Sequence, residues 1–365
     1  MKADRSFDFR GMDGYIPGVS IGTLIMGSNL TDIFKSGKSG DVATRIEGFK
    51  SRPSGAAHEG TGESKTDSRN PVITWYDLAT DFIEYGWGQS IHFASRAANE
   101  SFAASIARHE HYIALRLGLR PGMTAIDLGC GVGGPLIEIA RFSGARILGV
   151  NINALQLERA EKRCEAAGLG HLADWLHCDF MEIDAPDASF DAAYSIEGTC
   201  HAPDRTGVYA EIFRLLKPGG SLAVYECCMT DLFNPDDPDH RRLKTDMEYA
   251  SALPDIPMTH EVDDILRKVG FELVEARDIA ADAPPGIPWY QPMVGSGLSF
   301  ANFRSSAVGR RLTHGLLWLL ERLRIVPRGT TEVSNLLSFT AATFAEAGRL
   351  GIFTPMYFFH ARKPE

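Results

Sequence analysis

Several hallmarks of common protein classes are absent from this 365-residue chain. None of its six cysteines belongs to a Cys-x-x-Cys pair and several fall in predicted strands, so we expect buried, reduced thiols rather than a zinc site or disulfides. No apolar run approaches the roughly 18 residues of a transmembrane helix, and the N-terminus lacks the apolar core of a signal peptide. A net charge of −10 and a pI near 5.6 argue against a dedicated nucleic-acid binder.

The most informative stretch runs from Thr124 to Pro135. An apolar, strand-like entry leads into four glycines within six residues, and Pro135 then opens a helical pattern, where a missing N–H is tolerated. A strand, a glycine loop and a helix N-terminus together form a nucleotide-type site in an open α/β sheet. The spacing is Gly-x-Gly-x-Gly, and Asp127 stands two residues before the first glycine. This favours a cationic, phosphate-free ligand and is similar to the S-adenosylmethionine loop of Rossmann-like methyltransferases.

Strands and helices alternate through most of the chain. Seven strands are predicted, at 124–128, 146–150, 175–178, 190–196, 221–227, 271–279 and 356–361. This order predicts a doubly wound, mostly parallel sheet, whose site lies beyond the carboxyl ends of the strands. Asn151 and Asp179 stand at two such ends, so we expect Asn151 at the ribose of the cofactor and Asp179 with Phe180 at the adenine. Each is also a common cap or turn residue.

Three segments lie outside this pattern. Residues 36–70 are rich in Gly, Ser, Lys and Glu, which predicts a loose tail or linker. Aromatic residues crowd 75–93, where glycines on both sides of Trp87 predict an irregular loop that acts as a lid, with core packing as the alternative; a helix over 97–117 follows. About seventy residues precede the last strand, and their apolar helix at 312–325 is either packed in the core or lies on a membrane surface.

A set of ordered signatures in residues 70–365 resembles the sterol 24-C-methyltransferase family. The signatures are Glu84–Phe93, Gly129–Pro135, Ser195–Pro203, Lys217–Glu226, Ile287–Tyr290 and Phe353–Pro364. The resemblance implies an α/β, Rossmann-like class I methyltransferase fold, with a seven-stranded sheet whose last strand is antiparallel, an aromatic N-terminal lid and an α-rich insert before the last strand. It divides the chain into a variable, flexible segment (1–70), a lid and cap helix (71–120), an S-adenosylmethionine-binding core (121–283), a C-terminal insert (284–350) and a final core strand (351–365).

The chain departs from the family pattern at several positions. Ile83 and Ile91 replace aromatic residues, Gly198 replaces an alanine, the pair 227–228 replaces a Trp-containing pair with two cysteines, and 250–252 replaces a glycine-rich turn. Several of these positions are expected to form the substrate pocket, so the reaction class is better supported than the exact acceptor.

The resemblance implies methyl transfer from S-adenosylmethionine to carbon 24 in the side-chain alkene of a sterol, in sterol biosynthesis, with S-adenosylhomocysteine as the product. The π bond is itself the nucleophile, and the resulting carbocation needs π faces or carboxylates nearby before a base takes a proton. Catalytic roles are expected for Tyr85, Trp87, His92, Glu197 and His201, and the proton acceptor is His92, His201 or Glu197. Cofactor contacts are expected from Tyr76, Gln89, Ser90, Asp127, Gly129, Cys130, Gly131, Asn151, Asn153, Gln156, Asp179, Phe180 and Ile196, and no metal site is expected.

Alternative functions stay open at this point. In one alternative, the acceptor is another isoprenoid alkene such as squalene. In another, the chain is a non-catalytic, lipid-binding relative. A nicotinamide-dependent enzyme is disfavoured, because it would prefer the spacing Gly-x-Gly-x-x-Gly. A lipid substrate implies at least transient membrane contact. We therefore expect a cytoplasmic protein, or one bound peripherally to a sterol-containing membrane (the endoplasmic reticulum in a eukaryote), with no transmembrane span and no nucleic-acid partner. Homo-oligomer formation is left open.

Overall fold

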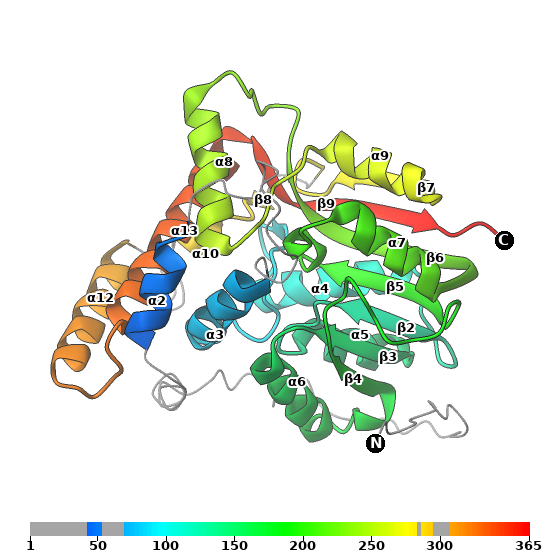
Figure 1. The fold of residues 1–365 in the computed structure, drawn as a ribbon, viewed down its shortest axis with the longest axis horizontal. Coiled ribbons are helices and arrows are strands. Elements are labelled where there is room, and N and C mark those ends of the chain that lie inside the picture. The colour runs from blue at the N-terminus through cyan, green and yellow to red at the C-terminus, as the bar shows by residue number, and fades with distance from the viewer. Residues whose placement is uncertain (1–41, 53–68, 283–285, 295–306) are drawn as a thin grey trace.

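The centre of the molecule is a seven-stranded sheet, in a computed structural model that describes residues 42–52, 69–282, 286–294 and 307–365 (Figure 1). Across the sheet the strands are β4 (Ala173–His177), β3 (Arg146–Asn151), β2 (Thr124–Leu128), β5 (Phe190–Ile196), β6 (Leu216–Met229), β9 (Phe353–Arg362) and β7 (Glu272–Asp278). The first five are parallel, and β9 is antiparallel to both of its neighbours. The predicted sheet, with its last strand reversed, is confirmed.

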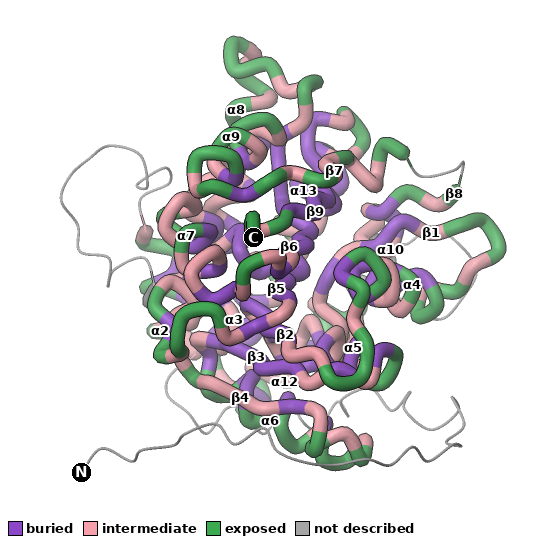
Figure 2. The backbone as a smooth tube through the Cα atoms, turned by 90° about the vertical axis from the view of Figure 1, so that its right-hand side faces the viewer, coloured by how far each residue is buried: buried purple, intermediate pink, exposed green. Residues whose placement is uncertain are grey.

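Helices cover both faces of this sheet. On one face lie α4 (Phe102–Arg116), α5 (Gly134–Ser143) and α6 (Ala154–Ala166), and on the other α7 (Arg205–Leu215) and α9 (Thr259–Val269). The inner strands are nearly continuous runs of buried residues because neither face meets solvent (Figure 2). The carboxyl ends of these strands are therefore the places where polar side chains can reach a ligand.

A second group of helices stands beside the sheet, at the left of Figure 1. It comprises α2 (Val42–Lys50), α3 (Arg69–Gly86), α8 (Pro238–Ser251), α10 (Gln291–Val294), α12 (Ala307–Arg322) and α13 (Thr330–Leu350). The helix α13 is its centre, because each of the other five packs against it. The short elements are the 3-10 turns η2 (Gly170–Leu172) and η3 (Thr199–His201) and a two-stranded sheet of β1 (Arg96–Ala97) with β8 (Gly286–Ile287).

The expectation of a loose segment at 36–70 is wrong for α2. Its Ile46 and Phe49 are buried, and they share apolar clusters with residues of α3 and α13. A nine-residue helix is marginal by itself in water, so this tertiary packing is what holds it.

Two boundaries near the predicted lid also differ from expectation. The helix α3 continues to Gly86, so the aromatic residues before Trp87 are helical, whereas the irregular loop expected around Trp87 is present after Gly86. The next helix begins at Phe102 instead of residue 97, because Ser101 accepts a hydrogen bond from the Ala104 backbone N–H at 3.1 Å and caps it.

The apolar helix predicted at 312–325 is α12, and core packing is the wrong description of it. Leu317 is buried, but most of the other large apolar side chains on this helix are exposed. No helix in the described part of the chain is both long and apolar enough to cross a membrane.

A buried carboxylate fastens α3 to the core. Glu84 forms ion pairs with Arg159, at 2.5 Å, and with Arg163, both on α6. Asp81, one turn earlier on α3, pairs with Arg159 at 2.6 Å. The Glu84 side chain is almost fully buried, so the two guanidinium groups replace the water that it has lost.

Replacing Glu84 with alanine should lower the free energy of unfolding by about 2 to 3 kcal/mol, because it leaves two partly exposed arginines short of their partner. Urea unfolding followed by circular dichroism measures the change. The matched control is Glu158→Ala, which removes an exposed carboxylate of α6 that pairs with Lys162 on that same helix. It should change the free energy of unfolding by no more than about 0.5 kcal/mol. Equal effects of the two variants would contradict the anchoring role.

Candidate active site

The glycine loop brings the ends of three strands together. The backbone N–H groups of Gly129 and Cys130 both donate to the Val150 carbonyl of β3, at 2.9 and 3.1 Å. A Cβ atom on Gly129, whose φ is +80°, would lie 3.1 Å from the Cα of Gly198, just beyond β5. Gly131 is also in the left-handed region, at φ +54°. The loop therefore closes tightly on the ends of β3 and β5.

Asp127 lies under this loop, near the carboxyl end of β2. Its side chain is buried, and its Oδ2 atom accepts no hydrogen bond from the described part of the chain. Burial raises the pKa of this carboxyl to about 8. A buried oxygen without a donor is costly unless a ligand supplies one. The α-ammonium group of S-adenosylmethionine is such a donor, so this residue fits the cofactor that the loop pattern predicted.

Among the other expected cofactor contacts, Asn151 at the end of β3 keeps a free acceptor. Its Nδ2 donates to the Gly131 carbonyl at 3.3 Å and to Gln156 Oε1 at 3.0 Å, while its Oδ1 accepts nothing from the described chain. Asn153 and Gln156 are occupied by protein: Asn153 caps α6 and donates to Asp77 at 2.8 Å, and Gln156 donates to a hydroxyl of α3 at 3.0 Å. These two residues join α3 to the core.

The remaining contacts expected at the adenine end surround the neighbouring strand ends. Asp179 follows β4, and its Oδ1 accepts from the Met181 backbone N–H at 2.9 Å. Phe180 is half-buried and packs against the core. Ile196 and Cys130 are buried at the end of β5 and within the glycine loop. All of them lie on the same edge of the sheet as Asp127 and Asn151, where the parallel strands end.

The segment after α3 lies directly on the start of α5. A Cβ atom on Gly134 would overlap the Gln89 carbonyl and lie 2.6 Å from the Ser90 hydroxyl oxygen. This contact places Gln89 and Ser90 against the last glycine of the loop. Only glycine leaves room for so close an approach of two backbones.

Gly134→Ala should therefore lower the free energy of unfolding by about 1 to 3 kcal/mol and weaken S-adenosylhomocysteine binding, because the covering segment must move outward. Thermal unfolding and calorimetric titration measure the two effects. Gly48→Ala is the control: its Cβ would meet nothing within 4 Å on α2, so helix propensity should stabilise that variant slightly. If Gly134→Ala binds the product as tightly as the parent protein, the covering role is wrong.

A cavity of about 320 Å³ lies beside this segment, a volume within the range of small-molecule sites. Its wall is mainly aromatic and aliphatic and comes from α3, the segment after α3, the ends of β5, β6 and α8, the turn η3, α10 and α13. The lining residues are Trp75, Tyr76, Phe82, Ile83, Gly86, Trp87, Ile91, His92, Phe93, Glu197, Cys200, His201, Cys227, Ser251, Leu253, Pro292, Met293, Leu337, Thr340, Ala341 and Phe344.

The cavity gathers four of the five expected catalytic residues, and Tyr85 is the exception. Trp87, His92, Glu197 and His201 line it, and so does Tyr76, which was expected at the cofactor. Tyr85 is on α3, nine residues after Tyr76, and nine residues are two and a half helical turns. It therefore lies on the opposite side of the helix from Tyr76 and does not line this cavity.

His92 is held by protein at both ring nitrogens. Nδ1 is 2.9 Å from the Phe93 carbonyl, which can only accept, so Nδ1 carries a proton. Nε2 is 3.1 Å from Glu110 Oε1, and both side chains are buried. Because one shared proton already lies between Nε2 and the carboxyl, His92 has no free lone pair for a proton from the cavity.

His201, in contrast, has one ring nitrogen that accepts a hydrogen bond from a cavity residue. Its Nδ1 is 3.4 Å from the Ala252 carbonyl and donates, so Nε2 is the acceptor for the Tyr76 hydroxyl at 2.9 Å. Burial alone would lower the pKa of this imidazole, but the negative charge of the adjacent Cys200 thiolate and the hydrogen bond to the Ala252 carbonyl outweigh burial, and the pKa is raised. The hydrogen bond from Cys227 lowers the pKa of the Cys200 thiol well below its usual range. A basic nitrogen therefore reaches the cavity through the Tyr76 hydroxyl.

Glu197 joins the covering segment to the sheet. Its Oε1 accepts from the Phe93 backbone N–H at 2.7 Å, and its own N–H donates to the Tyr225 carbonyl at 2.9 Å. Its φ is +55°, an unfavourable value for a residue with a side chain. Burial raises the pKa of this carboxyl well above its usual range. A strained acidic residue in a cavity wall is typical of a functional site.

Glu110 is a site residue that the sequence reasoning missed. It lies on α4, on the buried face that also carries Ile106, Ile113 and Ala114. A charged residue four positions after one apolar residue and three before another interrupts a helical apolar stripe, and this interruption is the signal that could have identified it.

The sheet order, the glycine loop and the buried carboxyl of Asp127, whose Oδ2 has no donor in the described chain, define a class I S-adenosylmethionine-dependent methyltransferase. Comparisons with known proteins agree with this assignment. Residues 126–224 match the family model described as a methyltransferase domain, and residues 300–365 match the model described as sterol methyltransferase C-terminal.

Named relatives narrow the class further. The chain is 46% identical over 326 residues to a cycloartenol-C-24-methyltransferase of Arabidopsis thaliana, covering 89% of this chain and 96% of that one. It is 42% identical to a sterol 24-C-methyltransferase of Saccharomyces cerevisiae, covering 82% and 80%. A cyclopropane synthase from Mycobacterium tuberculosis shares the fold, with a TM-score of 0.63, 17% identity and coverage of 83% and 100%. The chain belongs to the sterol 24-C-methyltransferase family.

Proposed function

We propose that this enzyme methylates carbon 24 in the side-chain alkene of a sterol. The observation that supports this most directly is the position of the apolar, aromatic cavity, which shares the segment 87–93 with the cover of the glycine loop. A lipid tail in the cavity would thus lie next to the bound cofactor. The sterol substrates in the names of the relatives fit such a wall.

S-adenosylmethionine, when bound, supplies an electrophilic methyl group. The chain's own part is to exclude water and to stabilise the positive charge that develops on the substrate. Trp87 and Phe93 line the cavity with their rings 5.2 Å apart in an edge-to-face pair. Their π faces stabilise a cation without reacting with it, and the Glu197 carboxyl adds a negative partner when it is ionised.

The proton leaves through Tyr76 in this mechanism. Its hydroxyl already donates to His201 Nε2, so the phenol oxygen can take the substrate's proton while its own proton passes to the imidazole. The substrate C–H bond breaks as the new alkene forms, and its proton forms a new O–H bond at Tyr76. The original Tyr76 O–H bond breaks, and that proton forms an N–H bond at His201 Nε2. His201 is therefore our choice among the three candidate bases.

The direct test is incubation of the purified protein with methyl-labelled S-adenosylmethionine and separate acceptors, namely desmosterol, zymosterol, cycloartenol, a 24-methylene sterol and squalene. Mass spectrometry should show one sterol gaining a methylene group's mass together with the label. Product binding without labelling of any acceptor would refute the proposed activity and favour a lipid-binding role.

A second acceptor class has one specific observation in its favour. Ile83, Ile91 and Cys227 are among the departures from the family pattern, and all three line the cavity. The wall that contacts the substrate is therefore changed, which favours testing squalene as another isoprenoid alkene. Labelled squalene, with all sterols unlabelled, would replace the sterol proposal.

We also propose that the enzyme meets its acceptor at a membrane that it contacts peripherally, either from the cytoplasm or while bound to a sterol-containing membrane such as the endoplasmic reticulum of a eukaryote. Sterols partition into bilayers, so a cavity of this chemistry must receive them from one. Cell fractionation with and without a high-salt wash would show whether the protein is released from membranes as a peripheral protein is.

A further inference from the structure

The outer face of α12 carries an apolar stripe that the described chain leaves exposed. The stripe consists of Leu312, Leu316 and Leu319 on the helix and Leu323 just past its end, where the Leu323 N–H still donates to the Leu319 carbonyl; these side chains are 60%, 49%, 46% and 58% exposed. Steps of four, three and four residues place these side chains on one side of a helix. Another side of α12 packs on α13 and contains Leu317, only 7% exposed. The helix therefore has one apolar face for protein and a second that needs another apolar environment.

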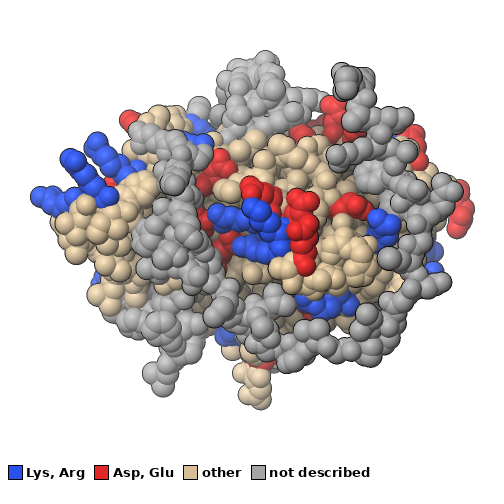
Figure 3. Space-filling model, turned by 90° about the horizontal axis from the view of Figure 1, so that it is seen from below, with Lys and Arg blue, Asp and Glu red and all other residues tan. Residues whose placement is uncertain are grey.

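The charge around this stripe is opposite in sign to that of the whole protein. Residues 307–328 contain five arginines and one glutamate, whereas the chain has a net charge of −10. The glutamate, Glu321, is engaged: its carboxylate accepts from the backbone N–H groups of Gly329 and Thr331, both at 2.9 Å, at the start of α13. Figure 3 shows basic side chains projecting at the end of the molecule where α12 lies in Figure 1.

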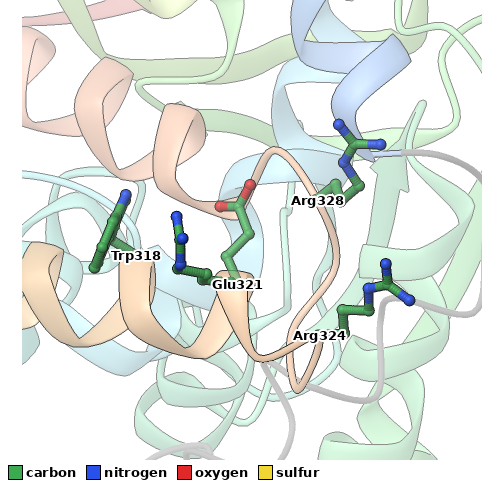
Figure 4. Close-up of a pocket in the computed structure, with 5 residues that line it drawn as sticks. Trp318, Glu321, Arg324 and Arg328 are labelled. Atoms are coloured by element: carbon green, nitrogen blue, oxygen red, sulfur yellow. The ribbon is translucent and has the colours of Figure 1, made fainter.

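Three of these arginines surround a hollow of about 420 Å³ beside the stripe (Figure 4). Arg322, Arg324 and Arg328 are exposed, and none forms an ion pair with the described residues. Glu321 and the exposed Trp318 complete the wall, and the Arg322 guanidinium lies 5.6 Å from the Trp318 ring centroid. An indole ring and long cationic side chains at the edge of an apolar stripe are suited to the boundary between acyl chains and headgroups.

We propose that the stripe and this hollow form a docking surface for a lipid bilayer with anionic headgroups. The four leucines enter the acyl boundary, and Arg322, Arg324 and Arg328 bind the headgroup phosphates or carboxylates. The positive charge beside the stripe favours an anionic bilayer over an uncharged apolar partner, because only the anionic partner would be attracted by the arginines. The inner face of the same helical layer, α13, lines the substrate cavity through Leu337 and Phe344, so docking would bring the bilayer within one helix layer of the site.

This inference rests on the proposed function only for its purpose, since docking itself requires no methyl transfer. Co-sedimentation of the full chain with vesicles of phosphatidylcholine, with or without about a third phosphatidylserine, measures it. We expect at least tenfold tighter retention on the anionic vesicles, and loss of that preference at high salt. The double variants Leu316→Ser/Leu319→Ser and Arg322→Glu/Arg324→Glu should each weaken retention by about tenfold or more.

The matched control is Leu115→Ser/Arg120→Glu, which makes the same types of change at exposed positions at the end of α4 and just beyond it, and it should bind vesicles as the parent does. Equal binding by control and α12 variants, or no preference for anionic vesicles, would overturn the proposal. So would sedimentation showing that the α12 variants break a dimer in vesicle-free buffer while vesicle binding stays absent, because the face would then join two copies of the chain.

A second readout separates this surface from the reaction. Methyl transfer to a sterol presented in cyclodextrin should be unchanged in both α12 variants, whereas transfer to the same sterol in anionic vesicles should fall with retention. Normal vesicle docking by a parent protein that methylates no acceptor would refute the proposed function and leave the docking surface standing.

Discussion

Replacing His201 with glutamine should lower kcat by about 10² to 10⁴-fold while leaving S-adenosylhomocysteine affinity unchanged, since general-base catalysis contributes about this much. The imidazole accepts from the Tyr76 hydroxyl at 2.9 Å, and glutamine keeps a polar side chain there without the basicity. Tyr76→Phe should lose activity by a similar order, because it removes the atom that links the cavity to the base. Steady-state kinetics with the best acceptor measure both effects.

The pH dependence gives a second readout of the same relay. The imidazole accepts a proton only when it is neutral, and its pKa is raised, so kcat should rise with pH along a limb that lies above the usual histidine range. His201→Gln should abolish that limb. His177→Gln, at an exposed histidine bound to a backbone carbonyl, should change nothing. Full activity of His201→Gln would reject the relay and return Glu197 as the candidate base.

Asp127→Asn should weaken S-adenosylhomocysteine binding by roughly 30-fold to several thousandfold, corresponding to the 2 to 5 kcal/mol lost when a buried charge pair is truncated. The Oδ2 atom of this buried residue has no donor in the described chain, and the ligand's α-ammonium would supply one. Isothermal titration calorimetry measures the affinity, and an unchanged melting temperature of the free variant would show that the fold is intact. A loss below threefold would show that the ammonium binds elsewhere.

The same residue links binding to protons. Burial raises the pKa of Asp127 to about 8 in the ligand-free protein, so at pH 7 the carboxyl is mostly protonated. A cation favours the carboxylate and lowers that pKa, so binding at pH 7 should release a proton, and affinity should rise with pH until about pH 8. Titration in two buffers of different ionisation enthalpy counts the proton. Asp127→Asn should release none, and proton uptake by the parent would contradict the assignment.

Much of the core was predictable because its signals are local. The strands 124–128 and 190–196 have the expected bounds, since each is a buried run ended by a glycine or a charged residue. The glycine loop needs positive φ values that only glycine adopts easily, so its sequence pattern and its shape are nearly the same information. The cofactor class follows from Asp127 next to that loop, and the family from the ordered signatures.

The tertiary structure decided what depends on partners distant in sequence. Periodicity can place a residue on a helix face, but it cannot say what lies opposite. Tyr76 and His201 are 125 residues apart, and His92 and Glu110 belong to different elements, so the sequence alone left the proton acceptor unassigned. The sequence did not identify the helix α3, so it did not predict that Tyr76 and Tyr85, nine residues apart on that helix, lie on opposite sides of it. The sequence also left open whether α12 packs in the core or lies at the surface. Two faces of that helix are apolar, and only the position of α13 shows which one is covered.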